Sequence, residues 1–461
     1  MANNLGDTGP NIQSFKLFYY FCRNYFYFFK KSTGIIFQMR NRTAIYLDLL
    51  HHYFSDYVLA LPKAERAKMA GFTRKAKLRH IALNSALELK RNLKTKSVAE
   101  TELHDKIWVF AYSQNDFDAL AFAKKIDGAI FVAERARKLK NCDKLYVLPY
   151  PSRLPYLRHF PSLIKGLVEA KNERAADLWD FIWTVTGWYE ITLEVLKKYR
   201  PKALLITNDH SCIPRALLLA GKELGIPTIF VQHASVTAHF PPLAFDLSLL
   251  EGQAAWDNYK KIGEITGRVE LIGMPKFDKF APLRKKPTEI NSLGIAFNLT
   301  DDLGKILKVC EVLHAKLPDL ALCVRPHPKD PTKHDWSATH PYISKSTGAQ
   351  ESAFEFLGRH DAIIANNTSI HLEALLLNMP SFYLDISRPD CKIEDLYGYI
   401  ANKLVPVAQS ADNIITFIQK HNQHPEDVYQ KAKYYNALVG TQEEGHSEEL
   451  VIKYINDFLN K

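Results

Sequence analysis

Two polar clusters in the second half of the chain combine side chains that can bind a phosphate group. Residues 325–328 read Arg-Pro-His-Pro, and residues 366–374 contain the hydroxyl pair Thr368 and Ser369. A histidine can donate to an anion, and hydroxyls that open a helix stand beside unpaired backbone N–H groups at the positive end of the helix dipole. Each cluster also has a simpler interpretation, a turn between two prolines for His327 and a helix N-cap for Thr368 or Ser369. Their occurrence together favours a site.

The spacing of Ser369 and Glu373 adds a second chemical feature to this cluster. They are at positions i and i+4, so both lie on one face of a helix. A carboxylate one turn inside the helix can accept hydrogen bonds from two ribose hydroxyls while the hydroxyls at its start hold a phosphate. The apolar residues 374–377 and Leu372 indicate that Glu373 is not a bare surface residue. The pattern therefore suits a nucleotide, which offers an anion and vicinal hydroxyls.

Two further clusters follow apolar runs in the first half of the chain. Residues 207–211 (Thr-Asn-Asp-His-Ser) contain Asp209, and residues 232–235 (Gln-His-Ala-Ser) contain His233. Asp209 has an alternative as the N-cap of a helix that starts near Ile213, and His233 has one as an ordinary core histidine. In open α/β sheets, ligands bind beyond the carboxyl ends of the strands. We therefore expect all four clusters to line that edge.

The elements that position these clusters alternate between strands and helices from about residue 105. This alternation predicts βαβ units and a mainly parallel sheet. Strands are expected at 107–111, 144–148, 203–206, 228–231, 247–250, 269–272, 292–297, 320–324, 362–365 and 381–384, with 129–132 either a strand or a helix end. Helices are expected over 11–100, 161–199, from 213 onward, and over 303–317 and 411–461.

A basic stretch with two prolines at 280–291 is the best linker candidate. It divides the chain into a helical N-terminal region (1–100), an α/β acceptor domain (101–285) and an α/β donor domain (286–461). The expected fold class is α/β, with two Rossmann-like domains facing a cleft and a helical N-terminal appendage.

Composition excludes several classes of protein. The 461 residues contain no apolar run of the ~18 residues that a membrane span needs and begin with no secretory signal. The six cysteines lack CxxC spacing, which favours reduced core thiols in a cytoplasmic protein. There is no nicotinamide, P-loop or nucleophile-elbow motif. Asp301-Asp302 is the one adjacent acidic pair suited to a metal, and a helix N-terminus explains both charges, so we expect no metal and no cofactor.

The basic N-terminal region allows two interpretations. The chain carries a net charge of +10. Residues 16–42 combine Lys and Arg with many aromatic side chains, and residues 63–96 add further Lys and Arg. These aromatics either pack against the protein while the cations face water, or dock on an anionic membrane surface. Nucleic-acid binding is disfavoured because no recognition motif accompanies the charge.

Five motifs together resemble a known family. They are residues 231–234 (Val-Gln-His-Ala), 273–278 (Gly-Met-Pro-Lys-Phe-Asp), 325–328, 367–375 and 378–380 (Asn-Met-Pro). Their order and spacing resemble bacterial surface-polysaccharide transferases of the GT-B fold, both the capsule transferases that use CMP-Kdo and the CDP-glycerol glycerophosphotransferases. The likeness covers about residues 200–385. Two positions depart from the families, Ala234 where Gly is usual and Asn366-Asn367 where Ser or Thr is usual.

The resemblance implies roles for the candidate residues. His327, within the motif that also holds Arg325, would contact the donor's phosphate or nucleotide, Thr368 and Ser369 the phosphate, and Glu373 the ribose. The acceptor hydroxyl would need a base, and His233 and Asp209 are the candidates.

The implied protein is a cytoplasmic, metal-independent glycosyltransferase of capsular or lipopolysaccharide-type synthesis. Its donor would be a nucleotide-sugar, cytidine-linked by preference, and its acceptor a glycan or lipid-linked glycan, met at the inner membrane if the interfacial interpretation holds. The alternatives are a CDP-glycerol or polyol-phosphate transferase, a non-hydrolysing UDP-sugar 2-epimerase, and a non-catalytic assembly scaffold.

Overall fold

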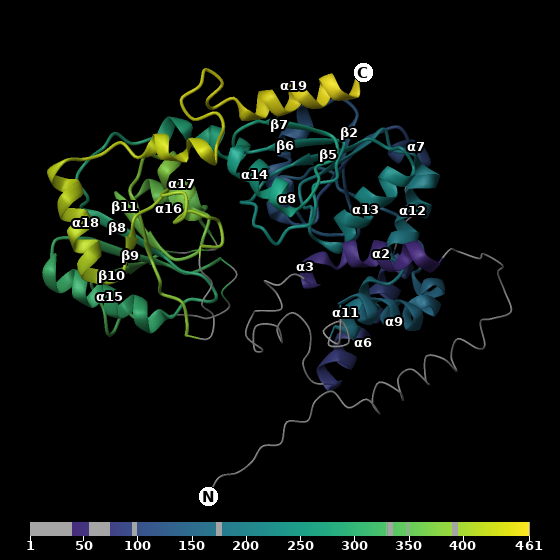
Figure 1. Ribbon diagram of the computed structural model, residues 1–461, viewed down its shortest axis with the longest axis horizontal. Coiled ribbons are helices and arrows are strands. Elements are labelled where there is room, and N and C mark those ends of the chain that lie inside the picture. The colour runs from purple at the N-terminus through teal and green to yellow at the C-terminus, as the bar shows by residue number, and fades with distance from the viewer. Residues whose placement is uncertain are drawn as a thin grey trace, which may run out of the picture. The chain divides into compact units, whose positions relative to one another are not determined.

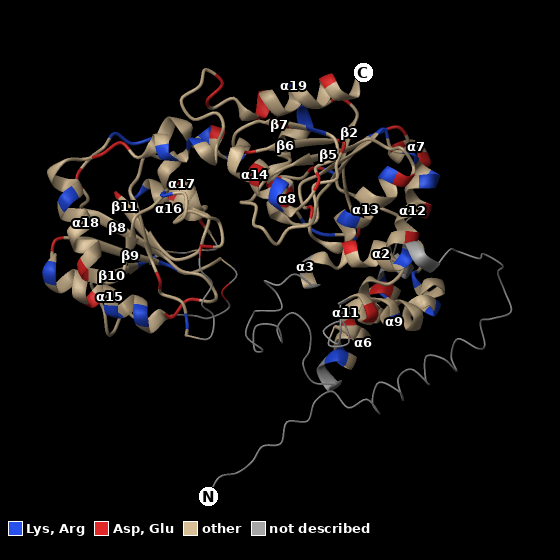
Figure 2. Cartoon of the chain, viewed as in Figure 1, with Lys and Arg blue, Asp and Glu red and all other residues tan. Residues whose placement is uncertain are grey.

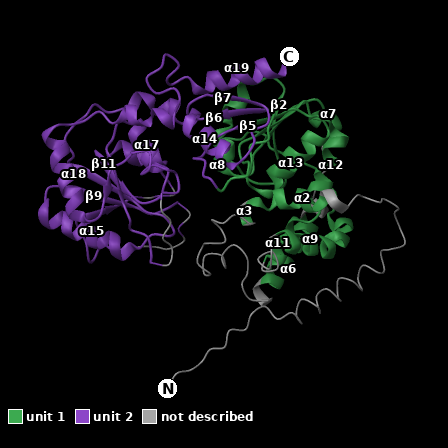
Figure 3. Ribbon diagram, viewed as in Figure 1, with its two compact units in different colours: residues 1–230, 239–246 green, residues 231–238, 247–461 purple. Residues whose placement is uncertain are grey.

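The chain divides into two compact units (Figure 3). A computed structural model describes residues 39–54, 74–94, 99–171, 178–328, 330, 335–346, 348, 350–389 and 395–460. Unit 1 comprises the described residues up to 230 together with 239–246, and unit 2 comprises 231–238 and the described residues from 247 onward. Basic and acidic residues are distributed over both units (Figure 2). Among the described residues, no helix has the length and hydropathy of a membrane span.

The strands before residue 280 form one sheet, called sheet A (Figure 1). Among the described residues its order is β3-β2-β1-β4-β5-β6-β7, and the strand pairs for which the register is known run parallel. The strands are β1 (Ile107–Phe110), β2 (Ala129–Ala133), β3 (Tyr146–Val147), β4 (Ala203–Ile206), β5 (Thr228–Val231), β6 (Leu247–Leu250) and β7 (Arg268–Leu271).

The strands after the predicted linker form sheet B, which belongs wholly to unit 2. In the described part of the chain its order is β10-β9-β8-β11-β12-β13, all parallel. The strands are β8 (Ser292–Ala296), β9 (Ala321–Arg325), β10 (Ile343–Lys345), β11 (Ala362–Ala365), β12 (Ser381–Leu384) and β13 (Val407–Ala408).

In both sheets the first strand lies in the middle. The chain adds the next two strands toward one edge and then returns to add the remaining strands toward the other edge, which is the Rossmann strand order. The reversal lies between β1 and β4 in sheet A and between β8 and β11 in sheet B. The α/β class with two Rossmann-like sheets is thereby confirmed. In sheets of this order, ligands bind beyond the carboxyl ends of the strands at the reversal point.

Helices connect the strands along both sheets (Figure 1). Those up to residue 283 are α2 (Met39–Leu49), α3 (His51–Phe54), α6 (Arg74–Lys94), α7 (Glu100–Leu103), α8 (Gln114–Ala119), α9 (Phe160–Lys171), α11 (Trp179–Val185), α12 (Trp188–Tyr199), α13 (Cys212–Glu223) and α14 (Gln253–Ile262), with 3₁₀ helices η1 (Ala121–Lys125), η2 (Leu154–His159) and η3 (Pro275–Leu283). Those after it are α15 (Leu303–Lys316), α16 (Ala353–Gly358), α17 (Ile370–Leu376), α18 (Ala411–Gln423), η4 (Tyr429–Tyr434) and α19 (Ser447–Leu459).

Apolar runs explain why most strands form where the sequence predicts them. Strands β1, β4, β5, β6, β11 and β12 are buried at every residue. Parallel strands covered on both faces need such continuous apolar runs. The predicted helix 161–199 is wrong in extent, because α9, α11 and α12 replace it. Gly187 separates the last two with a φ of +91°, a conformation that glycine adopts at little cost.

The described part of the N-terminal region packs into unit 1. Tyr46 and Leu49 on helix α2 and Leu50 directly after it are buried. The guanidinium of Arg215 donates twice to Asp48 on α2, at 2.6 Å each. Most of the aromatic stretch 16–42 and residues 63–73 lie outside the described residues.

Candidate functional site

Asparagine and aspartate side chains hold together the loops that follow β8 and β11, where sheet B reverses. Asn298 Nδ2 donates to the carbonyl of Asn367 at 2.7 Å, and Asn366 Nδ2 donates to Asp301 Oδ1 at 2.8 Å. Asn367 Oδ1 accepts from the N–H of Leu396 at 2.9 Å. The Asn366-Asn367 pair, which departs from the family pattern, therefore has a structural task in this chain.

Helix α17 begins directly after this loop with the hydroxyl pair. Ser369 is the N-cap residue, yet its side chain makes no capping hydrogen bond. The backbone N–H groups of Leu372 and Glu373 instead donate to the Ser369 carbonyl, at 3.0 and 3.4 Å. Ser369 thus occupies the N-cap position that the simpler interpretation gave it, but its hydroxyl makes no capping bond among the described residues. Thr368 and Ser369 are both half-buried, so the pair stands at the edge of the loop rather than in the core.

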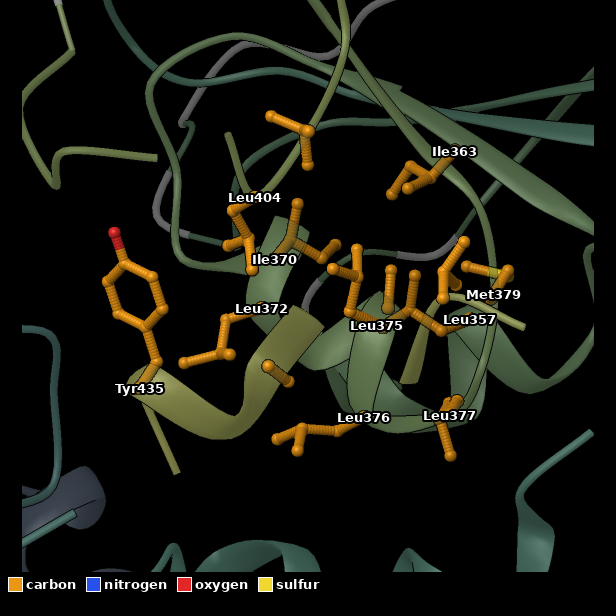
Figure 4. Close-up of a cluster of buried hydrophobic side chains, with 14 of the residues drawn as sticks. Leu357, Ile363, Ile370, Leu372, Leu375, Leu376, Leu377, Met379, Leu404 and Tyr435 are labelled. Carbon is orange, nitrogen blue, oxygen red and sulfur yellow. The ribbon is translucent and has the colours of Figure 1, made fainter. Parts of the chain in front are cut away.

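The rest of α17 lies within an apolar cluster (Figure 4). Every residue of Ile370–Leu376 is buried, and Leu372, Leu375 and Leu376 belong to the cluster of unit 2 drawn in that figure. Glu373 shares this helix and is buried as well. A carboxylate in such surroundings requires a charged or hydrogen-bonding partner, since an isolated buried charge is costly.

Lys276 is that partner. Its Nζ lies 2.8 Å from Glu373 Oε1, and it stands at the start of η3 within the Gly-Met-Pro-Lys-Phe-Asp motif. Burial alone would lower the pKa of Lys276, but Glu373 and Glu251 beside it raise that pKa above its usual value. The lysine is therefore a fixed cation next to the carboxylate.

Glu251 is a second buried carboxyl group near this pair. It follows β6, its N–H donates to Gln232 Oε1 at 2.9 Å, and its Oε2 accepts from Gln232 Nε2 at 3.3 Å. Its Oε1 is buried and has no hydrogen-bond partner within the described part of the chain. Burial raises the pKa of Glu251 to about 7, with Lys276 opposing the rise and Glu373 adding to it. Lys276 thus pairs with Glu373, and it acts on Glu251 only through its charge.

The segment that contains His233 reaches the same surroundings. Gln232 Nε2 also donates to the Ala234 carbonyl at 3.0 Å, and Ser235 Oγ lies 3.0 Å from the hydroxyl of Tyr399. Tyr399 is buried in the cluster around α17. His233 itself is half-buried at the carboxyl end of β5. Gln232 therefore connects the residues around His233 to Glu251.

Arg325 ends β9 and supports a turn. Its Nη2 donates to the carbonyls of Gly348 and Glu351, at 3.3 and 3.1 Å, and its guanidinium lies 5.5 Å from the centre of the Phe356 ring. Its Nε is buried without a hydrogen-bond partner. His327, two residues on, is half-buried, and its carbonyl accepts from the N–H of Asp330.

Asp209 belongs to unit 1 and follows β4 beside the reversal point of sheet A. It is buried, and its Oδ1 lies 3.2 Å from Nδ1 of His210. Its interpretation as an N-cap is wrong, because Ser211 occupies that position of α13. Asn208 Oδ1 instead holds the turn by accepting from the N–H of Ser211 at 3.0 Å.

The acidic pair Asp301-Asp302 has two different explanations. Asp302 caps α15 by accepting from the N–H groups of Gly304 and Lys305, as its position predicted. Asp301 is not a capping residue: its Oδ2 accepts from the N–H of Asn298 and its Oδ1 from the Asn366 amide. Within the described residues, no group of three or more acidic, His or Cys side chains is arranged to hold a metal ion.

Sequence reasoning missed Lys276 and Glu251 as members of the site. The one signal for Glu251 was an acid directly after the apolar run 247–250, and for Lys276 a lysine inside a family motif. Neither shows that the two side chains meet Glu373, which is 97 residues from Lys276 in the chain.

Comparisons with known proteins yield likenesses of structure only. No protein-family model matches this chain, and no curated protein sequence matches it significantly.

Similar solved structures include a UDP-N-acetylglucosamine 2-epimerase from Rickettsia bellii, with 13% identity and a TM-score of 0.48 over 77% of this chain and 97% of that one. A UDP-GlcNAc 2-epimerase from Neisseria meningitidis, bound to UDP-GlcNAc, has 12% identity and a TM-score of 0.48 over 77% and 100%. The wall teichoic acid polymerase TagF has 11% identity and a TM-score of 0.48 over 84% and 98%. At such values the likeness says nothing about this chain's substrate.

Proposed function

We propose that this chain is a metal-independent transferase that uses a nucleotide-activated donor to build a surface polysaccharide, and that it binds the nucleotide at the start of α17. One observation carries the proposal. The hydroxyl of Ser369 makes no capping bond, and Glu373, one turn further along the same face, is buried and held by Lys276. The arrangement offers hydroxyl donors for a phosphate and a fixed carboxylate for a ribose.

On the donor side, the transferred group leaves a phosphate whose negative charge grows in the transition state. Hydrogen bonds stabilise that charge when their donors are already in place. The donors are the hydroxyls of Thr368 and Ser369 and the side chain of His327. Glu373 accepts from the ribose hydroxyls, and Lys276 orients its carboxylate by the hydrogen bond to Oε1. Arg325 holds the turn at 348–351 that follows the His327 segment.

On the acceptor side, a hydroxyl attacks the donor and must lose its proton to a base. His233 and Asp209 are the candidates. His233 follows β5, next to the Gln232 side chain that binds Glu251, and Asp209 is buried beside His210. A histidine suits this task because its unperturbed pKa lies near neutral pH.

The choice of a cytidine nucleotide and of a surface polysaccharide rests on the motifs at 231–234, 273–278, 325–328 and 367–380. These motifs resemble both CMP-Kdo capsule transferases and CDP-glycerol glycerophosphotransferases. A CDP-polyol donor is therefore the closest alternative.

Nucleotide-induced thermal stabilisation tests the proposal. We expect CMP or CDP to raise the melting temperature more than UMP, UDP or GDP. The 2′,3′-dideoxy form of the best nucleotide should stabilise less, because Glu373 then loses both hydroxyl donors. Glu373→Gln should remove most of that difference, whereas Glu426→Gln, at an exposed position of the same unit, should leave it intact.

Donor consumption then separates the branches. Turnover of a CMP-sugar supports the sugar transferase, and turnover of CDP-glycerol supports the polyol-phosphate transferase. Epimerisation of UDP-GlcNAc, or stabilisation by no nucleotide at all, would overturn the proposal.

A further inference from the structure

Helix α6 turns its charged side toward the protein. In the described part of the helix, Lys77, His80, Asn84 and Glu88 recur at helical spacing, and Lys77 and Glu88 are buried. The helix lies beside α11 in unit 1 (Figure 1). Its inward face is thus polar, the reverse of the usual arrangement for a surface helix.

Ion pairs fix α6 in this orientation. Arg153 donates from its backbone N–H, Nε and Nη2 to the Glu88 carboxylate, at 2.9, 3.0 and 2.7 Å. At the other end of the helix, His80 Nδ1 lies 2.7 Å from Asp180 Oδ2, and Lys77 Nζ lies 3.9 Å from Asp180 Oδ1. Asp180 is fully buried. These contacts prevent the helix from rotating its charges toward water.

The outward face of α6 is apolar and cationic. Four leucines are exposed, Leu78 at 41%, Leu83 at 57%, Leu87 at 45% and Leu89 at 58%. The other exposed residues between 77 and 90 are Ala82, Ala86, Arg79 and Lys90. Arg79, Leu83, Ala86 and Lys90 follow one another at helical spacing. Glu88, the only acid in the helix sequence, is on the inward face, so this outward surface carries no negative charge.

Such a surface is unfavourable in water alone. Each of these leucines forgoes part of the free energy that full burial would give, and burying ion pairs adds a desolvation cost. A helix that met only water would gain by presenting the opposite face. The orientation is explained if the outward face has an apolar and anionic counterpart.

We infer that the outward face of α6 docks on an anionic lipid surface. Leucines enter the boundary between headgroups and acyl chains, and Arg79 and Lys90, which lie between them, pair with anionic headgroups. The described part of this face exposes no acid, so no carboxylate repels the anionic headgroups. This inference goes beyond the proposed function, because it concerns where the chain docks and not which donor it uses.

Vesicle flotation of the full chain tests it. Wild-type protein should float with vesicles of phosphatidylcholine containing about 30% phosphatidylglycerol and not with phosphatidylcholine alone, and binding should fall as salt shortens the Debye length. The double variant Leu83→Ser/Leu87→Ser should bind anionic vesicles roughly tenfold more weakly or worse. Arg79→Gln/Lys90→Gln should also bind more weakly and depend less on salt.

A matched control uses exposed leucines elsewhere. Leu283 and Leu299 in unit 2 are exposed to a similar extent, so Leu283→Ser/Leu299→Ser should float like wild type. Equal flotation of the α6 variants and wild type would overturn the inference and place docking in another segment, such as residues 1–38. If wild-type protein did not float with anionic vesicles, the inference would also be overturned, and a protein would then be the partner to test for the outward face of α6.

Two readouts keep this test separate from folding and from the donor site. Each variant should retain the wild-type melting temperature and the wild-type stabilisation by nucleotide. If the leucine variant does not fold, the Arg79→Gln/Lys90→Gln variant decides the matter, because both side chains are exposed.

Discussion

Two buried glutamates, Glu88 in unit 1 and Glu251 in unit 2, are held in opposite ways. In unit 1, Glu88 is matched by Arg153 through three hydrogen bonds, which joins the N-terminal helices to the sheet-bearing part of the unit. In unit 2, Lys276 pairs with Glu373, while one oxygen of the buried Glu251 has no hydrogen-bond partner among the described residues. A matched pair serves the fold. A buried carboxyl group without a counter-charge of its own, whose pKa is raised, is the arrangement that functional sites favour.

The largest effect that this comparison predicts is on stability. Arg153→Met should lower the free energy of unfolding by ~3–5 kcal/mol, because Glu88 remains buried without a counter-charge. Urea unfolding followed by circular dichroism measures the loss. Nucleotide affinity of the folded variant should stay unchanged.

A second substitution sharpens this prediction. Adding Glu88→Leu to Arg153→Met should recover part of the lost stability, since the unpaired charge is then gone. A loss below about 1 kcal/mol for the single variant would mean that the pair behaves like a surface ion pair, and the contrast between the units would fail.

The next effect concerns the pH dependence of stability. The folded state raises the pKa of Glu251 from 4.5 to about 7, so native Glu251 binds its proton more tightly than the unfolded chain does. Its contribution is therefore full below pH 4.5 and is lost as pH rises through about 7. The loss is on the order of 3 kcal/mol. Glu251→Gln cannot ionise and should remove this slope.

Urea unfolding between pH 4.5 and 8 checks the sign. Glu251→Gln should gain stability relative to wild type as the pH rises, and Glu426→Gln, an exposed acid, should follow wild type throughout. A parallel course for Glu251→Gln and wild type would show that Glu251 is ionised in the folded state at all these pH values.

A smaller effect contrasts two serines at helix starts. Ser410 caps α18 by accepting from the N–H of Asn413, whereas Ser369 makes no capping bond. Ser410→Ala should cost ~1 kcal/mol of stability and leave nucleotide affinity unchanged. Ser369→Ala should barely change stability but weaken nucleotide binding by ~1–3 kcal/mol, as should His327→Ala.

Isothermal titration calorimetry with the best nucleotide measures these affinities. If both Ser369→Ala and His327→Ala bound the nucleotide with wild-type affinity, the nucleotide would not bind at the start of α17. A stability loss in Ser369→Ala equal to that in Ser410→Ala would return Ser369 to an ordinary capping role.

The sequence predicts features that depend on neighbouring residues better than features that depend on contacts between distant residues. Strands 203–206, 228–231 and 362–365 were predicted to the residue, because each is a local apolar run ended by a polar cluster. The Ser369–Glu373 spacing is also local. The break at Gly187 was missed because helical periodicity continues on both sides of it.

The contacts of the site were not predictable, because they join distant parts of the chain. Lys276 and Glu373 are 97 residues apart, and no local pattern brings them together. The orientation of α6 has the same cause. Its leucines are exposed because Arg153 and Asp180, far along the chain, hold its charged face.

The smallest expected effect is that of a chelator. The acidic pair Asp301-Asp302 already accepts hydrogen bonds on both carboxylates. Asp302 accepts from the N–H groups of Gly304 and Lys305, and Asp301 accepts from the N–H of Asn298 and the side-chain amide of Asn366. Recruiting them to a metal would uncap α15 and loosen the loop next to Asn367. Transfer activity should therefore be unchanged by EDTA. Loss of activity in EDTA that magnesium or manganese restores would assign the metal to Asp301, and the phosphate charge would then be stabilised by a cation in addition to the hydroxyls of Thr368 and Ser369.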